Sequence, residues 1–185
     1  MADNGNGGYG NGNGGSYATR WGSGGGREPD SVLFTNVRVL DGSGEYPFTG
    51  EVLVQGNRIK QITKGGSRFG STGSTATVID GMGATLMPGL IEAHLHLSWN
   101  NAPGVEPIQK MPIEEHTLVT IEMAKVVLDA GFTAGRGAAA AKPRLDVVVR
   151  DAINEGRFPG PRYTAAGPEI TTLGGLGDFT LPHMP

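Results

Sequence analysis

The sequence predicts an α/β protein in two parts, a small antiparallel β-domain followed by alternating strands and helices. Two observations predict this order. Residues 31 to 86 hold short runs of β-branched and aromatic residues, and turn residues separate these runs. From residue 87 onward, apolar runs alternate with segments of helical spacing, which is typical of a β/α barrel or a doubly wound sheet.

A glycine-rich tail precedes the β-domain, since eleven of the 32 glycines lie in the first 30 residues. The run from residue 4 to residue 26 alternates Gly with Asn and Ser. Such a segment cannot bury enough apolar surface to offset its conformational entropy, so we expect residues 1 to 30 to be disordered. An adhesive or assembly-promoting tail with Tyr9, Tyr17 and Trp21 as contacts is the alternative.

Four short strands are expected in the β-domain, which spans residues 31 to 86 and is interpreted as sandwich-like. The first strand covers residues 32 to 39 and ends at Asp41-Gly42. Gly56-Asn57 separates the next two runs, and this pair tolerates positive φ, which predicts a hairpin. The remaining predicted strands span residues 51 to 55, 58 to 62 and 77 to 80.

The second part, residues 87 to 185, begins with a strand that is expected to be buried on both faces. Residues 90 to 97 are apolar at both alternating sets of positions, apart from Glu92 and two histidines. Helices are expected at residues 112 to 130 and 144 to 155, and each is followed by a glycine suited to a C-terminal cap. Further strands are expected at residues 132 to 133 and 163 to 166.

His94 and His96 are the candidate metal ligands. Successive side chains of a strand point to opposite faces, so Glu92, His94 and His96 share one side of the strand. The aliphatic set on the other side is expected to pack against helices, and it consists of Ile91, Ala93, Leu95 and Leu97. Two imidazoles two residues apart can converge on one ion at Zn–N distances of about 2.0–2.1 Å. The chain has no cysteine, so any metal must bind nitrogen or oxygen.

The segment from Met87 to His96, Met-Pro-Gly-Leu-Ile-Glu-Ala-His-Leu-His, resembles the PGxIDxHxH signature of the amidohydrolase superfamily. Residues 151 to 162 and 165 to 167 are similar to the branch with imidazolonepropionase-like enzymes and Xaa-Pro or Xaa-Arg dipeptidases. The resemblance covers roughly residues 31 to 180. It implies a metal-binding hydrolase that cleaves an amide or related C–N bond through a metal-activated water, with zinc as the default metal and one or two ions.

The resemblance also implies that residues 87 to 185 are only the first three strands of a TIM-like (β/α)8 barrel, since such a barrel typically needs about 250 residues. The family's further ligands are a carboxylated Lys or an acid, two His and a terminal Asp, and none of them is recognisable. We therefore expect the natural chain to continue past Pro185 and to supply its catalytic residues there. Substrate-binding residues are not assigned.

Two departures from the family pattern affect the site. Glu92 stands where the family usually has Asp, and we interpret it as a carboxylate that supports the metal ligands without binding the ion itself. Gly135-Arg136-Gly137 stands where the family often has Val-Arg-Asp after the second strand. Trp99 and Asn100 follow the histidine pair and could line the mouth of the site.

The other polar candidates receive structural interpretations. His116 is expected on a solvated helix face, and His183 could approach the site only through a loop. Lys125 is assigned to a helix and Lys142 to the loop after the second strand. Asp178, after the glycines that begin at residue 174, is interpreted as a turn former.

Composition limits the partners. Fifteen basic against 18 acidic residues give a net charge of −3, too small to suggest binding to nucleic acid or an anionic membrane. No secretory leader or run of apolar residues long enough for a membrane span is recognisable, which predicts a cytoplasmic protein with a small-molecule substrate. It could form a homo-oligomer. The alternative function is a catalytically inactive fragment, or a non-enzymatic interaction module that uses the glycine-rich tail.

Overall fold

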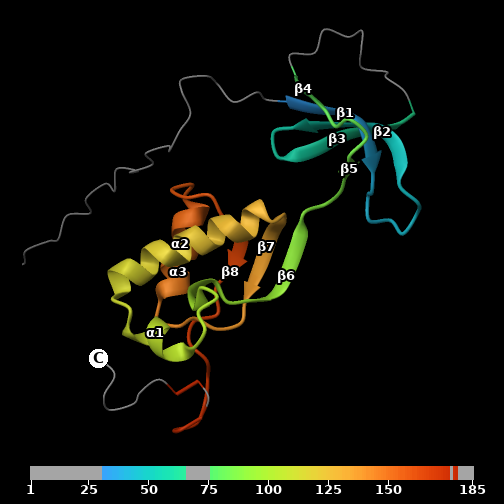
Figure 1. The fold of residues 1–185 in the computed structure, drawn as a ribbon. Coiled ribbons are helices and arrows are strands. Elements are labelled where there is room, and N and C mark those ends of the chain that lie inside the picture. Colours follow the sequence, from blue (N-terminus) through green and yellow to red (C-terminus); the bar gives the residue numbers. More distant parts are fainter. Residues whose placement is uncertain (1–30, 66–75, 176, 179–185) are drawn as a thin grey trace, which may run out of the picture.

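Residues 31–65, 76–175 and 177–178 are described by the computed structural model, and they form two sheets with helices on the second (Figure 1). The predictions for residues 1 to 30 and for His183 lie outside the described residues. Within the described ranges, no helix is both long enough and apolar enough to cross a bilayer.

The first sheet has five strands in the order β3-β2-β1-β4, and the short β5 also pairs with β1. The strands are β1 Ser31–Val39, β2 Phe48–Gln55, β3 Arg58–Lys64, β4 Thr77–Asp80 and β5 Thr85–Leu86. The pairs β1–β2 and β2–β3 are antiparallel, so the predicted hairpin is confirmed. Gly56 begins its turn with a φ of 56°, which favours glycine.

The prediction of a wholly antiparallel β-domain is wrong for β4 and β5, because both pair parallel to β1. In a hairpin chain the fourth strand would lie beside β3, but β4 takes the edge of β1 that β2 leaves open. A strand that returns in the parallel direction needs a crossover connection of about a dozen residues. The segment between β3 and β4, residues 65 to 76, has that length. Strands β1 to β5 therefore form one mixed sheet, whose core residues are Val37, Val39 and Val52.

The second sheet is wholly parallel and has the order β6-β7-β8, as predicted for the βα units. Its strands are β6 Leu90–Leu95, β7 Phe132–Gly137 and β8 Arg162–Thr164. The helices are the 3-10 turn η1 Leu97–Trp99, α1 Val105–Lys110, α2 Ile113–Asp129 and α3 Leu145–Asn154. Helices α2 and α3 end before Gly131 and Gly156, which have φ values of 93° and 71°.

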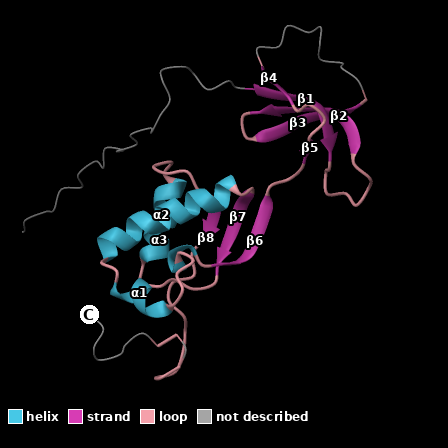
Figure 2. Cartoon of the chain, in the orientation of Figure 1, coloured by secondary structure: helices cyan, strands magenta, loops and turns pink. Residues whose placement is uncertain are grey.

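Helices α2 and α3 lie side by side on one face of this sheet (Figures 1 and 2). Between them and the strands is a core of Leu97, Ala124, Val149 and Tyr163, with Leu95 packed against it. Strands in chain order with both crossover helices on one face are typical of the beginning of a β/α barrel, because a doubly wound sheet carries helices on both faces.

Three details of this region differ from the predictions. Strand β6 ends at Leu95, because residues 97 to 99 turn into η1. Of the aliphatic set, Leu95 and Leu97 pack in the core, whereas Ile91 is 72% exposed, since β6 is the edge strand and no described helix covers its first half. Helix α1 was not predicted, because its six residues are too short for a periodic pattern.

Tyr163 of β8 offers a first test of this core. Its side chain is buried, and its hydroxyl has no hydrogen-bond partner among the described residues. Burial raises the pKa of Tyr163 to about 12, and the charge of Asp146 adds to the shift. The folded protein therefore keeps the phenol proton at pH values where the unfolded chain, with an ordinary pKa of 10.0, releases it.

We expect Tyr163→Phe to leave the free energy of unfolding at pH 7 unchanged or slightly raised, since it removes an unsatisfied buried hydroxyl. Above pH 10 the wild-type protein should lose about 1.4 kcal/mol per pH unit relative to the variant, up to a pH of about 12. Urea denaturation of both proteins from pH 7 to pH 11 measures the difference. Parallel pH profiles would contradict the assigned burial of the phenol.

Candidate metal site

His94 and His96 lie at the carboxyl end of β6 and face one another. His94 is the second-last residue of β6, and His96 is the single residue between β6 and η1. Their Nε2 atoms are 3.0 Å apart, and the two rings meet edge to face with centroids 4.9 Å apart. Leu95 between them points into the helix-covered core, so both imidazoles lie on the opposite, open face of the sheet.

The second ring nitrogen of His96 indicates which tautomer it adopts. Nδ1 lies 3.2 Å from the backbone carbonyl oxygen of Ala139, in the loop after β7. A carbonyl oxygen only accepts hydrogen bonds, so Nδ1 carries the proton and the Nε2 lone pair is directed toward His94. Metal-binding histidines have the same arrangement, in which the distal nitrogen is held by a carbonyl or carboxylate.

The pair fits a zinc ion as two of its ligands. Two nitrogens at about 2.0–2.1 Å from one tetrahedral ion are about 3.3 Å apart, close to the 3.0 Å between these Nε2 atoms. Within the described residues, no group of three or more His, Asp or Glu side chains converges to form a complete site. The described part of the chain therefore brings together two candidate ligands, His94 and His96.

Glu92 lies on the same strand, but its contact is with the backbone. Its Oε1 accepts a hydrogen bond from the backbone N–H of His94 at 3.1 Å. The half-buried carboxylate therefore stabilises the backbone of the strand at His94. The hydrogen bond does not involve the imidazole ring of His94. The role of Glu92 in supporting the metal ligands without binding the ion stays a prediction.

The turn that follows His96 is anchored to two other elements. The Ser98 hydroxyl accepts a hydrogen bond from the backbone N–H of Ala141 at 2.8 Å. The Ser98 carbonyl oxygen lies 2.7 Å from Nε2 of His116, on α2. The prediction that His116 lies on a solvated helix face is wrong, since its side chain is 0% exposed. Helical spacing did not reveal this, because η1 covers the face of α2 that contains His116.

Arg136 is a cation on the open face of the sheet. A Cβ atom built on Gly135 would lie 2.5 Å from Cδ2 of Leu95, and one built on Gly137 would lie 2.4 Å from the Tyr163 hydroxyl. Both glycines therefore face the helix-covered core, and Arg136 between them faces the same side as His94. Gly135 and Gly137 pair with Glu92 and Leu95 of β6, so Arg136 lies beside the histidine strand.

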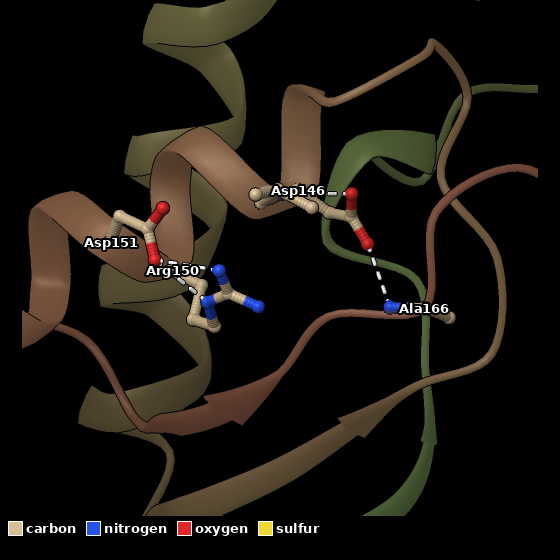
Figure 3. A network of polar contacts seen from close by, with 5 residues as sticks. Asp146, Arg150, Asp151 and Ala166 are labelled. Atoms are coloured by element: carbon tan, nitrogen blue, oxygen red, sulfur yellow. Dashed lines mark hydrogen bonds and ion pairs between the residues drawn. The ribbon is translucent and has the colours of Figure 1, made fainter.

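Asp146 connects α3 to the loop after β8, and Figure 3 shows its carboxylate beside Ala166. One oxygen accepts from the backbone N–H of Val147 at 2.8 Å. The other accepts from Ala166 at 2.9 Å and from Gly167 at 2.8 Å. The carboxylate is 0% exposed, so it organises the loop at the carboxyl end of β8.

The remaining sequence candidates have structural contacts. Lys142 lies in the loop after β7 and donates to the backbone carbonyls of Gln109 and Met111 at 2.8 and 2.7 Å. Lys125 pairs with Asp129 along α2. Asp178 accepts a hydrogen bond from the backbone N–H of Gly174 at 2.7 Å, which supports its interpretation as a turn former.

Of the residues predicted at the mouth, Trp99 lies against the pair, with its ring centroid 5.6 Å from that of His96. Asn100 adopts a left-handed conformation with φ of 53°, and its side-chain amide is buried. Sequence reasoning missed the roles of Ser98, Ala139 and His116. Ser98 and His116 differ from other polar residues of these segments in being buried. No periodic pattern in the sequence predicts that burial.

The fold has counterparts among solved structures. A prolidase complexed with N-methylphosphonate-L-proline matches with a TM-score of 0.68 and 27% identity, over 80% of this chain and 35% of that chain. A Xaa-Pro dipeptidase with methionine bound in its active site matches with a TM-score of 0.65 and 29% identity, over 80% and 36%. The chain is related to the amidohydrolase superfamily.

The sequence comparison agrees with this relationship. The 5'-deoxyadenosine deaminase of Methanothermobacter thermautotrophicus is 40% identical over 76 residues, which make up 41% of this chain and 16% of that enzyme. No family model matches the chain. This amidohydrolase-related chain thus spans about a third of the length of the solved structures and about a sixth of the curated relative.

Proposed function

We propose that this chain forms part of the active site of a zinc-dependent hydrolase acting on an amide or related C–N bond of a small molecule. The observation that carries the proposal is the pair of Nε2 atoms 3.0 Å apart at the carboxyl end of β6, with Nδ1 of His96 held by Ala139. Active sites of β/α barrels lie at this end of the strands.

His94 and His96 would hold the ion, and the carbonyl of Ala139 keeps the His96 lone pair directed at it. When bound, zinc lowers the pKa of a water molecule and polarises the scissile carbonyl. Glu92 braces the backbone of β6 at His94, which limits the movement of that ligand. The Trp99 ring packs edge to face against His96, and its indole lies 5.6 Å from that ring.

Arg136 favours a substrate that carries a carboxylate. Arg136 alternates with two glycines that face the core, so its side chain leaves the strand on the face of His94, and it has no ion-pair partner among the described residues. A guanidinium binds a carboxylate through two parallel hydrogen bonds. A dipeptide-like amide with a free carboxyl group suits this arrangement better than a purine nucleoside does.

Zinc binding and hydrolysis together test the proposal. We expect the metal-free protein to bind zinc, measured by competition with a chromogenic chelator, and to bind it more weakly than a complete four-ligand site. Zinc-loaded protein is then assayed with an Xaa-Pro dipeptide, its C-terminal amide and 5'-deoxyadenosine. Protein that retains no zinc would contradict the proposal and favour the non-enzymatic interaction module.

A further inference from the structure

His116 is a buried imidazole that the proposed reaction does not use. It lies in the first turns of α2, and no part of its side chain reaches solvent. Its Nε2 faces the Ser98 carbonyl oxygen at 2.7 Å, so this nitrogen carries the proton and donates. Its Nδ1 has no partner among the described residues, and burial lowers the pKa of His116, so the ring is held neutral.

The acceptor of this hydrogen bond belongs to the turn that presents the second metal ligand. Ser98 is 1% exposed and lies two residues after His96. Its hydroxyl accepts from Ala141, and His96 contacts Ala139 of the same loop. These two contacts join the turn to the loop after β7, and His116 joins it to α2.

The His116 N–H donates the hydrogen bond from α2 to this turn, and it acts beside the packing of Leu97 against Ala124. A buried carbonyl without a donor is costly, so removing the His116 N–H would favour a shift of η1 that exposes the Ser98 oxygen. Because η1 begins directly after His96, this shift would turn the imidazole of His96 away from His94. The angle between two metal ligands changes when one of them moves.

We propose that His116 is a positioning residue for the metal ligand His96, acting through the Ser98 carbonyl oxygen. The inference rests on the proposed zinc site, although the hydrogen bonds exist without the metal. It predicts that a residue one helix away from the site controls zinc affinity, in the same way that outer partners of metal ligands do in other sites.

Four variants of the full chain test the inference. His116→Gln places an amide nitrogen as far along the side chain as Nε2 and should retain zinc affinity within about threefold, well below the 10–100-fold cost of losing an outer partner. His116→Asn is one bond shorter and His116→Leu donates nothing, so both should bind zinc about 10–100-fold more weakly. Thr120→Val is the control, since Thr120 is equally buried on α2 but its hydroxyl bonds, within the described part of the chain, to the carbonyl of His116 alone.

Circular dichroism establishes that each variant is folded before its zinc affinity is measured by chelator competition. If His116→Leu does not fold, the contrast between Gln and Asn still decides. Equal zinc affinity of the Gln and Asn variants, or wild-type affinity of a folded Leu variant, would overturn the inference.

A metal-free readout separates this inference from the proposed function. The Trp99 ring lies 5.6 Å from the His96 ring, so its fluorescence reports the position of the turn. In a Trp21→Phe background, which leaves Trp99 as the only tryptophan, His116→Leu should shift the emission and His116→Gln should not. A wild-type protein that binds no zinc refutes the proposed function. An emission unchanged by His116→Leu refutes the positioning role.

Discussion

Replacing both His94 and His96 with alanine should weaken zinc binding by at least about 100-fold, because loss of even an outer partner of a ligand costs 10–100-fold. The two Nε2 atoms are 3.0 Å apart and are the only imidazole nitrogens that converge among the described residues. Each single variant leaves one imidazole, which holds zinc no better than a surface histidine. Both single variants should therefore resemble the double variant.

Elemental analysis after dialysis and chelator competition measure this loss. His183→Ala is the matched control, since it also removes one of the four histidines and His183 is not part of the pair. The control should keep wild-type affinity. Unchanged zinc content in the double variant would place the metal elsewhere and refute the assignment of the site. A large loss in the control would show that the pair is not the main ligand set.

Asp146→Ala should destabilise the protein by about 3–5 kcal/mol, because each buried N–H left without an acceptor costs about 1–3 kcal/mol. The carboxylate accepts from three backbone N–H groups in a fully buried position (Figure 3). It also lies in the first turn of α3, where a negative charge is favourable. Asp146→Asn should cost less, since its amide oxygen can still accept from Ala166 and Gly167 and only the acceptor for Val147 is lost.

Urea denaturation of wild type and variants gives the difference in the free energy of unfolding. Asp151→Ala is the control from the same helix, since the Asp151 carboxylate bonds to no described group but the side chain of Arg150, at 2.7 and 2.9 Å. That exposed pair should contribute less than about 1 kcal/mol. If Asp146→Ala costs no more than Asp151→Ala, the loop after β8 is not held by this carboxylate.

Local patterns in the sequence predicted most of the strands and helices, and they singled out the candidate metal ligands. The Gly56-Asn57 turn, the parallel βα units and the helix over residues 113–129 follow from local spacing and from glycines that adopt positive φ. The spacing of His94 and His96 also follows from local geometry, because side chains two apart in an extended chain share one face. Such features depend only on residues that are close together in the sequence, so the sequence is sufficient to predict them.

The tertiary structure alone decided which distant segments meet. Strand β4 pairs parallel to β1, although the outer edge of β3 is also open among the described strands. His116 is buried because η1 folds over α2, and its hydrogen bond to Ser98 joins residues 18 apart. Asp146 bonds to backbone groups 20 and 21 residues away. Contacts of this kind depend on how elements pack, and packing is a property of the whole chain that no local pattern encodes.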